Sequence, residues 1–184
     1  SLLLHLVKNH DKVKFNFTYP SDISFGFRGQ YDPYKTREKV ANIINNSELK
    51  GEIIFNPGWA AQIDLKAHNN LVQAFAAVLQ NNIFSLCPRG AGEDTIRFYE
   101  SCFFGRIPIM ISHAKAMLED TYPNKFFFRI SPDLSDQETY AELKKISQTP
   151  LNELHKMCDN ARDYFKTVVV EYFKDPTKMF LETL

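Results

Sequence analysis

The sequence lacks the features that mark several large classes of protein. Its 22 basic and 22 acidic residues cancel, so it has no basic excess of the kind that a general nucleic-acid or membrane-surface binder needs. Its most apolar end, Ser1–Val7, is too short to span a membrane and has no basic flank. We therefore expect no nucleic-acid partner and no membrane contact within this chain, and we slightly favour a cytoplasmic location.

Cysteines and metal-ligand patterns are equally sparse. The three cysteines, Cys87, Cys102 and Cys158, cannot form a fully paired set of disulfides, so we expect buried free thiols. Histidines and cysteines do not occur at metal-ligand spacings, and no Asp-x-Asp triplet is present. We expect neither a bound metal nor a cofactor.

Short apolar runs alternate with amphipathic stretches about every 25 residues, which predicts a parallel α/β sheet. The runs predict strands near residues 23–28, 52–55, 83–87, 107–112 and 126–130. The stretches between them predict helices near residues 33–46, 71–80, 93–104 and 114–119. Because the strands are apolar throughout, helices should cover both faces, as in a Rossmann-like fold.

The chain divides into three predicted segments of one domain. Residues 23–131 form the α/β part, and residues 132–184 form a helical C-terminal tail that starts with the capping box Ser135-x-x-Glu138. Further helices should begin at Thr149–Pro150 and Asp175–Pro176. Residues 1–22 form an N-terminal segment that could continue from a missing domain, with residues 13–19 as a candidate edge strand.

Residues 84–112 are the most informative stretch, because they read as strand, glycine-containing loop, helix and second strand. Arg89 and Gly90 lie in the loop, and Arg97 and Glu100 lie on the helix. A loop that leads from a strand end into a helix N-terminus is where open α/β sheets bind phosphorylated ligands. Two arginines for phosphates and a carboxylate for ribose hydroxyls suggest a nucleotide diphosphate.

The same stretch resembles the exostosin-like glycosyltransferases. Their signature has Cys-Pro-Arg-Gly, then Ser or Thr, then Arg-Phe-x-Glu-Ala, then Gly-x-Ile-Pro. This sequence matches the signature at every spacing. The matching residues are Cys87-Pro88-Arg89-Gly90, Thr95, Arg97-Phe98-Tyr99-Glu100-Ser101 and Gly105-Arg106-Ile107-Pro108. The one substitution is Ser101 for alanine. A weaker match upstream has a strand that ends at Gly29 and an arginine, Arg37, in the following helix. The resemblance covers roughly residues 23–131.

The resemblance implies the C-terminal, donor-binding half of a two-domain GT-B glycosyltransferase. The donor would be a nucleotide diphosphate sugar, with UDP-sugar favoured, and the acceptor would be a hydroxyl of a glycan or another molecule. The implied donor-binding residues are Arg28, Gly29, Arg37, Arg89, Gly90, Thr95, Arg97 and Glu100. The catalytic base is expected from a second, N-terminal domain, so no catalytic residue is assigned in this chain.

Two absences bear on the mechanism that the resemblance implies. Many retaining enzymes of this architecture carry two glutamates eight positions apart, whereas Glu93 and Glu100 are seven apart. An inverting mechanism therefore fits better. The missing Asp-x-Asp is the usual metal and nucleotide-sugar clamp of the other main glycosyltransferase fold, so we expect a metal-independent reaction.

Plain structural roles remain open for several of these residues. Arg28 could mark the solvent boundary of a strand, Arg37 could form a surface ion pair, and Thr95 could cap a helix. Arg97 and Glu100 could belong to a solvated helix face. Three aromatic residues near strand ends could stack on a base or a sugar, or could pack at the rim: Tyr31, Tyr34 and Trp59.

Two other functions remain as alternatives. One is a GDP-fucose-dependent, fucosyltransferase-like domain, which a lysine two residues after Thr95 would favour. That position holds Arg97. The other is a nucleotide-binding or interaction module without catalysis.

Overall fold

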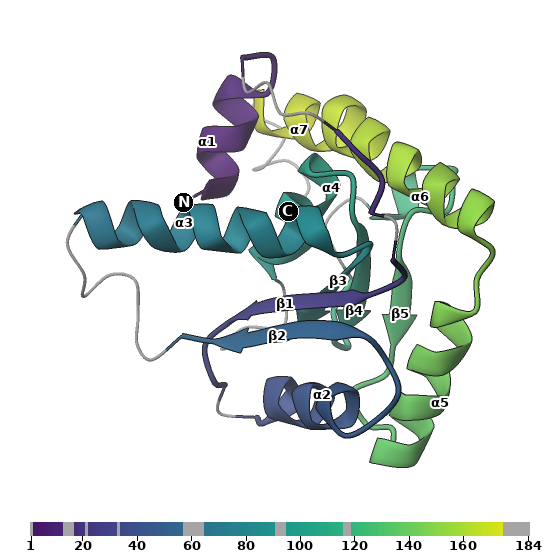
Figure 1. Cartoon of the computed structure of the whole chain (residues 1–184). Helices are drawn as coiled ribbons and strands as arrows, with labels where there is room; N and C mark the ends of the chain where they lie inside the picture. Colours follow the sequence, from purple (N-terminus) through teal and green to yellow (C-terminus); the bar gives the residue numbers. More distant parts are fainter. Residues whose placement is uncertain are drawn as a thin grey trace.

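The computed structural model describes residues 2–12, 17–20, 22–32, 34–56, 65–90, 95–115 and 119–174. Its centre is a single parallel sheet in the order β2-β1-β3-β4-β5 (Figure 1). The strands are β1 Phe25–Gly29, β2 Gly51–Phe55, β3 Phe84–Pro88, β4 Ile107–Ile111 and β5 Phe128–Ile130. The predicted parallel α/β sheet is confirmed.

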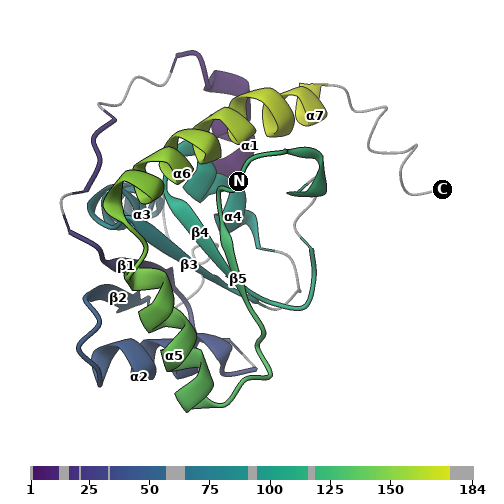
Figure 2. The same cartoon turned by 90° about the vertical axis from the view of Figure 1, so that its right-hand side faces the viewer.

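Helices cover both faces of the sheet, as the apolar strands predict. They are α1 Leu2–Asn9, α2 Thr36–Asn45, α3 Leu65–Asn81, α4 Ile96–Phe103, α5 Asp136–Ser147, α6 Leu151–Tyr164 and α7 Val170–Lys174. In Figure 1, α1, α3 and α7 lie on one side of the sheet, and α2 and α5 lie on the other. A π-helical segment, Phe165–Val169, joins α6 to α7, and Figure 2 shows the two as one continuous rod.

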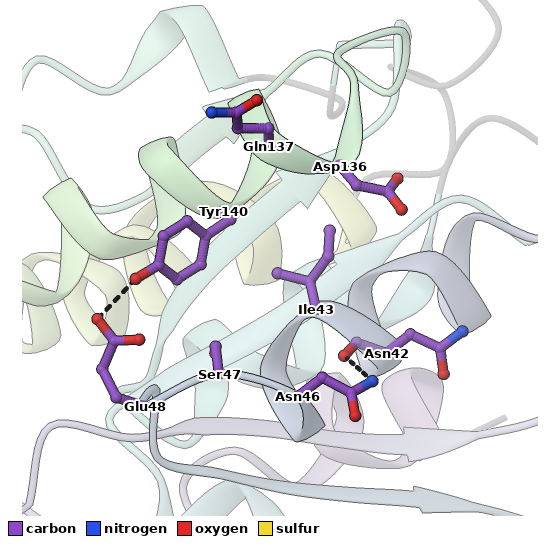
Figure 3. Close-up of a pocket in the computed structure, with 8 residues that line it drawn as sticks. All are labelled: Asn42, Ile43, Asn46, Ser47, Glu48, Asp136, Gln137 and Tyr140. Atoms are coloured by element: carbon purple, nitrogen blue, oxygen red, sulfur yellow. Dashed lines mark hydrogen bonds between the residues drawn. The ribbon is translucent and has the colours of Figure 1, made fainter.

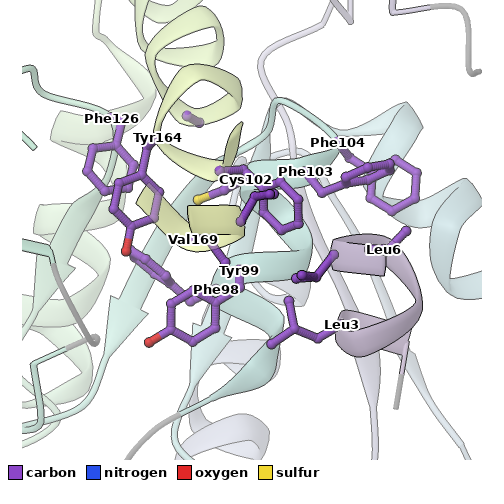
Figure 4. Packing of buried hydrophobic residues seen from close by; sticks show 14 of the residues in the cluster. Leu3, Leu6, Phe98, Tyr99, Cys102, Phe103, Phe104, Phe126, Tyr164 and Val169 are labelled. Atoms are coloured by element: carbon purple, nitrogen blue, oxygen red, sulfur yellow. The ribbon is translucent and has the colours of Figure 1, made fainter. Parts of the chain in front are cut away.

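Alternate residues of the buried strands supply two separate cores. In β4, Ile107 and Ile109 face the cluster under α2 and α5, whereas Met110 faces the cluster under α4. This alternation is the two-residue period of a strand that is covered on both faces. Aromatic rings dominate the second cluster (Figure 4), where Phe126 stacks on Tyr164 with ring centroids 4.3 Å apart.

The three cysteines are free and buried, as expected. Burial raises the pKa of Cys87 to about 11 and that of Cys158 to about 12. Because the thiolate is the reactive form, burial disfavours reactivity of these cysteines, whose side chains pack in the core.

The start of α2 differs from the prediction. The helix begins at Thr36, because Lys35 adopts the left-handed conformation with φ 57° and interrupts any helix from residue 33. Asp32 still caps the start of the helix, although it lies four residues before Thr36. Its carboxylate accepts hydrogen bonds from the backbone N–H groups of Tyr34 at 2.8 Å and Arg37 at 2.9 Å.

Other segments agree or differ in instructive ways. The capping box of Ser135 and Glu138 starts α5 as predicted. Residues 17–20 are not in a strand. Of the helix expected at 114–119, residues 114 and 115 are not helical, residues 116–118 lie outside the described part of the chain, and residue 119 begins a 3-10 turn, Glu119–Thr121. Helix α3 begins before the predicted residue 71, because its first turns lack a clear apolar period. Asp175–Pro176, Trp59 and Glu93 lie outside the described residues.

Candidate functional site

The strand order reverses direction between β1 and β3, which defines the place where open α/β sheets bind ligands. From β1 the chain moves to β2 at one edge, and from β3 it moves to β4 and β5 on the other side. Ligands of such sheets bind outside the carboxyl ends of the strands at this switch point. The predicted site residues lie there, at the ends of β1 and β3 and in the first two turns of α2 and α4: Arg28, Gly29, Arg37, Arg89, Gly90, Thr95, Arg97 and Glu100.

Arg97 reaches from the first turn of α4 to the end of β1. Its Nη2 donates a hydrogen bond to the backbone oxygen of Arg28 at 2.5 Å. Its guanidinium carbon lies 4.7 Å from the centre of the Phe27 ring and 5.3 Å from that of Phe75. Burial lowers the pKa of Arg97, and the charge of Arg37 lowers it further. The guanidinium is therefore held by a carbonyl and aromatic faces, and no carboxylate lies within ion-pair distance among the described residues.

Arg37 approaches the same place from α2. Its Nη1 donates to the backbone oxygen of Gln30 at 2.8 Å, and its guanidinium carbon lies 5.9 Å from the centre of the Phe27 ring. Burial lowers the pKa of Arg37, while the nearby Asp32 carboxylate partly offsets this. The Phe27 ring thus contacts two guanidinium groups, that of Arg37 from α2 and that of Arg97 from α4.

The two glycines of the predicted site leave room for these guanidinium groups. A Cβ on Gly90 would lie 2.7 Å from Nη2 of Arg37, and a Cβ on Gly29 would lie 3.0 Å from Nη2 of Arg97. Neither glycine has a positive φ, so the requirement is for space and not for backbone conformation. A larger residue at either position would displace an arginine.

Three of the site's arginines have a buried N–H group without a hydrogen-bond partner. The Nε atoms of Arg28, Arg37 and Arg97 are inaccessible to solvent and form no hydrogen bond, although that of Arg37 lies 4.0 Å from Oδ2 of Asp32 in an ion pair. A buried donor left unsatisfied costs about 1–3 kcal/mol, and in native proteins it calls for an explanation such as a missing ion. Arg89 lies beside them at the end of β3, with its guanidinium carbon 3.8 Å from the centre of the Tyr34 ring.

Glu100 is a buried carboxyl group beside this cationic cluster. It is 9% exposed, and its carboxyl group makes no hydrogen bond or ion pair within the described part of the chain. Burial raises the pKa of Glu100 to about 7, although the positive charge of Arg97 acts in the opposite direction. Its oxygens keep their full capacity to accept hydrogen bonds.

Thr95 occupies the N-cap position of α4, with φ −132° and ψ 118°. Its side chain makes no capping hydrogen bond, although threonine at this position commonly does so. Thr95 is 7% exposed at the helix start. Thr95 therefore does not cap α4 through its side chain, which was one of the two roles that the sequence left open.

The second half of the signature motif is structural. Ser101 is fully buried where α4 crosses β3, and its Oγ lies 2.7 Å from that of Ser85 and 2.6 Å from the backbone oxygen of Arg97. This close packing leaves room only for a small residue at this position of the motif. Gly105, with φ 62°, ends α4 in a Schellman motif, because its N–H bonds the oxygen of Cys102 and the next N–H bonds that of Ser101.

Arg106 is a structural arginine that sequence reasoning did not single out. It is 1% exposed and donates to backbone oxygens at the C-terminal end of α3, those of Leu79 at 2.7 Å and Gln80 at 3.0 Å. A cation at a helix C-terminus is favourable because the last carbonyls lack helical partners. Its only sequence signal is its fixed place after Gly105.

A separate hollow of about 510 Å³ lies between α2 and α5 (Figure 3). None of the predicted site residues lines it. In its lining, Glu48 accepts a hydrogen bond from Tyr140 at 2.6 Å and pairs with Lys144 at 2.8 Å. Lys144 and then Tyr140 lower the pKa of Glu48 to about 2.

The described residues contain no cluster of three or more histidine, cysteine, aspartate or glutamate side chains that could hold a metal ion. Within the same part of the chain, no helix has the length and apolar character needed to cross a membrane.

Fold and site together define a Rossmann-like α/β domain with a cationic cluster at its switch point. The model of the RXYLT1 C-terminal domain family matches residues 7–130, which is more than half of the chain, so the protein belongs to this family. Its members are C-terminal domains of xylosyltransferase-type glycosyltransferases, which belong to the exostosin-like group. The match ends at the last residue of β5 and leaves α5, α6 and α7 outside. No curated protein matches the chain.

Proposed function

We propose that this chain is the donor-binding domain of a GT-B glycosyltransferase and holds a nucleotide diphosphate sugar, with a UDP-sugar favoured. The observation that carries the proposal is the set of buried, unsatisfied Nε atoms of Arg28, Arg37 and Arg97 at the switch point of the sheet. A diphosphate supplies the acceptor oxygens that these donors lack.

The chemistry we infer is displacement at the anomeric carbon. The acceptor oxygen forms a bond to that carbon while the bond to the diphosphate breaks, and negative charge develops on the leaving group. Guanidinium groups held in advance by carbonyls and aromatic rings would stabilise this charge without reorganising. The acceptor proton would pass to a base of a second domain.

The inverting course and the independence from metal are part of this proposal. They rest on the two motifs that the sequence lacks, the glutamates eight positions apart and the Asp-x-Asp triplet. The charge of the leaving diphosphate would then be stabilised by arginines. The family's xylosyltransferase-type name makes UDP-xylose the first donor to test.

Glu100 is the group we assign to the ribose. A buried carboxylate beside cations, with its acceptor positions unused, suits two neighbouring hydroxyl donors. The hydroxyls would replace the water that burial has removed.

Calorimetric titration of the chain with UDP, with and without EDTA, tests the proposal. We expect a dissociation constant on the order of 10 μM to 1 mM that EDTA does not change. Arg97→Ala should weaken binding by about tenfold or more, because one charged hydrogen bond contributes about 1.5–3 kcal/mol.

The matched control is Arg162→Ala. Arg162 lies over the Phe17 ring, at 4.2 Å, beside the glycine that ends α4 at the opposite edge of the sheet. Its loss should leave UDP binding unchanged. Absence of UDP binding at millimolar ligand, or its abolition by EDTA, would contradict the proposal, and tighter binding of GDP would favour the fucosyltransferase-like alternative.

A further inference from the structure

We propose that Tyr31, supported by Phe55, is the stacking platform for the nucleobase of the donor, and that Asn56 binds the edge of that base. The inference rests on the proposed function and adds to it a base subsite at the carboxyl ends of β1 and β2. It gives these three residues a share in deciding which nucleotide is bound.

The geometry of the two rings carries the first step. Tyr31 lies two residues beyond β1, and Phe55 is the last residue of β2. Their ring centroids are 4.3 Å apart and the planes differ by 7°, so the rings are parallel. Tyr31 is 64% exposed, which leaves its outer face open. An exposed ring held parallel by a second ring is a surface prepared for another planar group.

The platform joins directly to the cationic cluster. Phe55 packs on Phe27 with centroids 5.6 Å apart, and Phe27 carries the guanidinium groups of Arg97 and Arg37. The rings of Tyr31, Phe55 and Phe27 therefore form a continuous row of contacts between the open stacking surface and the groups that would bind the diphosphate. A nucleoside diphosphate has the same order, with a planar base at one end and phosphates at the other.

Asn56 supplies an independent observation. Its backbone N–H donates to the oxygen of Gly29 at 2.7 Å, which places the residue between the ends of β1 and β2. Its side-chain Oδ1 is buried and has no hydrogen-bond partner. A side-chain amide offers an acceptor and a donor side by side, and the N3–H and C4=O of uracil offer the complementary pair.

Tyr34 is the competing platform. It is 55% exposed, but the guanidinium of Arg89 lies 3.8 Å from its ring centre and covers one face. No ring of the described residues lies parallel beneath it. Tyr31 is favoured because its support is another ring and its open face is not shared with a cation.

The test compares two probes that differ in the base, UDP and inorganic pyrophosphate, by calorimetric titration of the whole chain. Tyr31→Ala should weaken UDP binding at least about fivefold and leave pyrophosphate binding unchanged, because stacking on one base is lost. Tyr31→Phe keeps the ring and should bind UDP as the parent does. Asn56→Ala should also weaken UDP alone.

The same series separates this inference from the proposed function. Arg97→Ala should weaken both probes, and if it weakens neither, the donor site itself is wrong. If Arg97→Ala behaves as expected but Tyr31→Ala leaves UDP affinity intact or lowers both affinities equally, the platform is wrong and the donor site stands. A loss specific to UDP in Tyr34→Ala, and not in Tyr31→Ala, would move the base to the other ring.

Discussion

At the scale of single residues, the cationic cluster combines groups that are costly to bury. Arg97 and Arg37 are partly withdrawn from water, and no carboxylate of the described residues is hydrogen-bonded to either guanidinium. The ion pair of Arg37 with Asp32 is long, at 4.0 Å, and the carboxyl group of Glu100 is buried nearby without a hydrogen bond. Buried charges with weak or no pairing destabilise a fold unless something offsets them. In a donor site, the ligand provides that offset, which is why such residues are poor for stability and suited to binding.

Replacing Glu100 with glutamine should change how stability depends on pH. The folded pKa is about 7 and the ordinary value is 4.5, so the folded state holds this proton more tightly. Between these values the unfolded chain ionises first, and stability falls as pH rises. Glu100→Gln removes that loss, so the variant should gain up to about 3 kcal/mol relative to the parent between pH 4.5 and 7.5. Urea unfolding at several pH values measures this difference.

Below pH 4.5, Glu100 is protonated in both the folded and the unfolded state of the parent. The difference in free energy of unfolding between parent and variant should therefore be constant there. A gap that does not grow between pH 4.5 and 7.5 would show that Glu100 is solvated. Asp120→Asn, at an exposed carboxyl group outside the cluster, is the control.

A methyl group at Gly90 should impair binding without touching the ligand. The new Cβ would lie 2.7 Å from Nη2 of Arg37, so the guanidinium must move. We expect Gly90→Ala to weaken UDP binding by about three- to tenfold, measured by calorimetry, and to change the free energy of unfolding by less than about 1 kcal/mol, since a flexible side chain gives way. In an Arg37→Ala background the substitution should have no further effect, and additive losses would contradict this explanation.

At the scale of elements, α4 is held at its first turn, its middle and its C-terminal end, and only the first of these contacts belongs to the site. Its first turn sends Arg97 to the end of β1, and its middle is held to β3 through Ser101. Its C-terminal end closes on Gly105, so that the chain turns directly into β4. The signature motif therefore specifies the length of α4 and its packing against β3, and this packing fixes the position of Arg97.

Gly105→Ala should destabilise the fold because it strains this helix end. The residue has φ 62°, and its Cβ would lie 2.5 Å from Cε2 of Phe17 and 2.6 Å from Cδ of Arg162. The left-handed conformation and the crowding together should cost about 2 kcal/mol or more, measured by chemical unfolding. Gly90→Ala is the matched control, because that glycine has no positive φ. Equal stability of the two variants would contradict the assignment of the helix end.

At the scale of the whole molecule, donor binding should stabilise the fold. A ligand that binds only the folded state at 100 times its dissociation constant adds about 2.7 kcal/mol. For a chain of this size we expect UDP at that excess to raise Tm by about 5–10 °C, followed by scanning calorimetry. EDTA should not reduce the shift, and Arg97→Ala should reduce most of it. An equal shift with uridine would place the affinity in the base and not in the cationic cluster.

Local patterns in the sequence determined most of the fold. The apolar runs, the capping box of Ser135 and Glu138, and the glycine-containing motif around Arg89 are short-range features, and each acts through the residues beside it. Their order along the chain is enough to predict a parallel sheet covered on both faces. The prediction was weakest where a single backbone conformation decided the outcome, as at the left-handed Lys35 that delays α2.

Only the tertiary structure decided how the candidate site is assembled. The order of the strands places the end of β1 between those of β2 and β3, and this brings Arg37 against Gly90 and Tyr31 against Phe55. These partners are far apart in sequence, and their meeting depends on which strands become neighbours. The sequence could name the charged groups because their chemistry is local. Their burial, and the unsatisfied Nε atoms of Arg28, Arg37 and Arg97, arise only when distant segments pack together and exclude water.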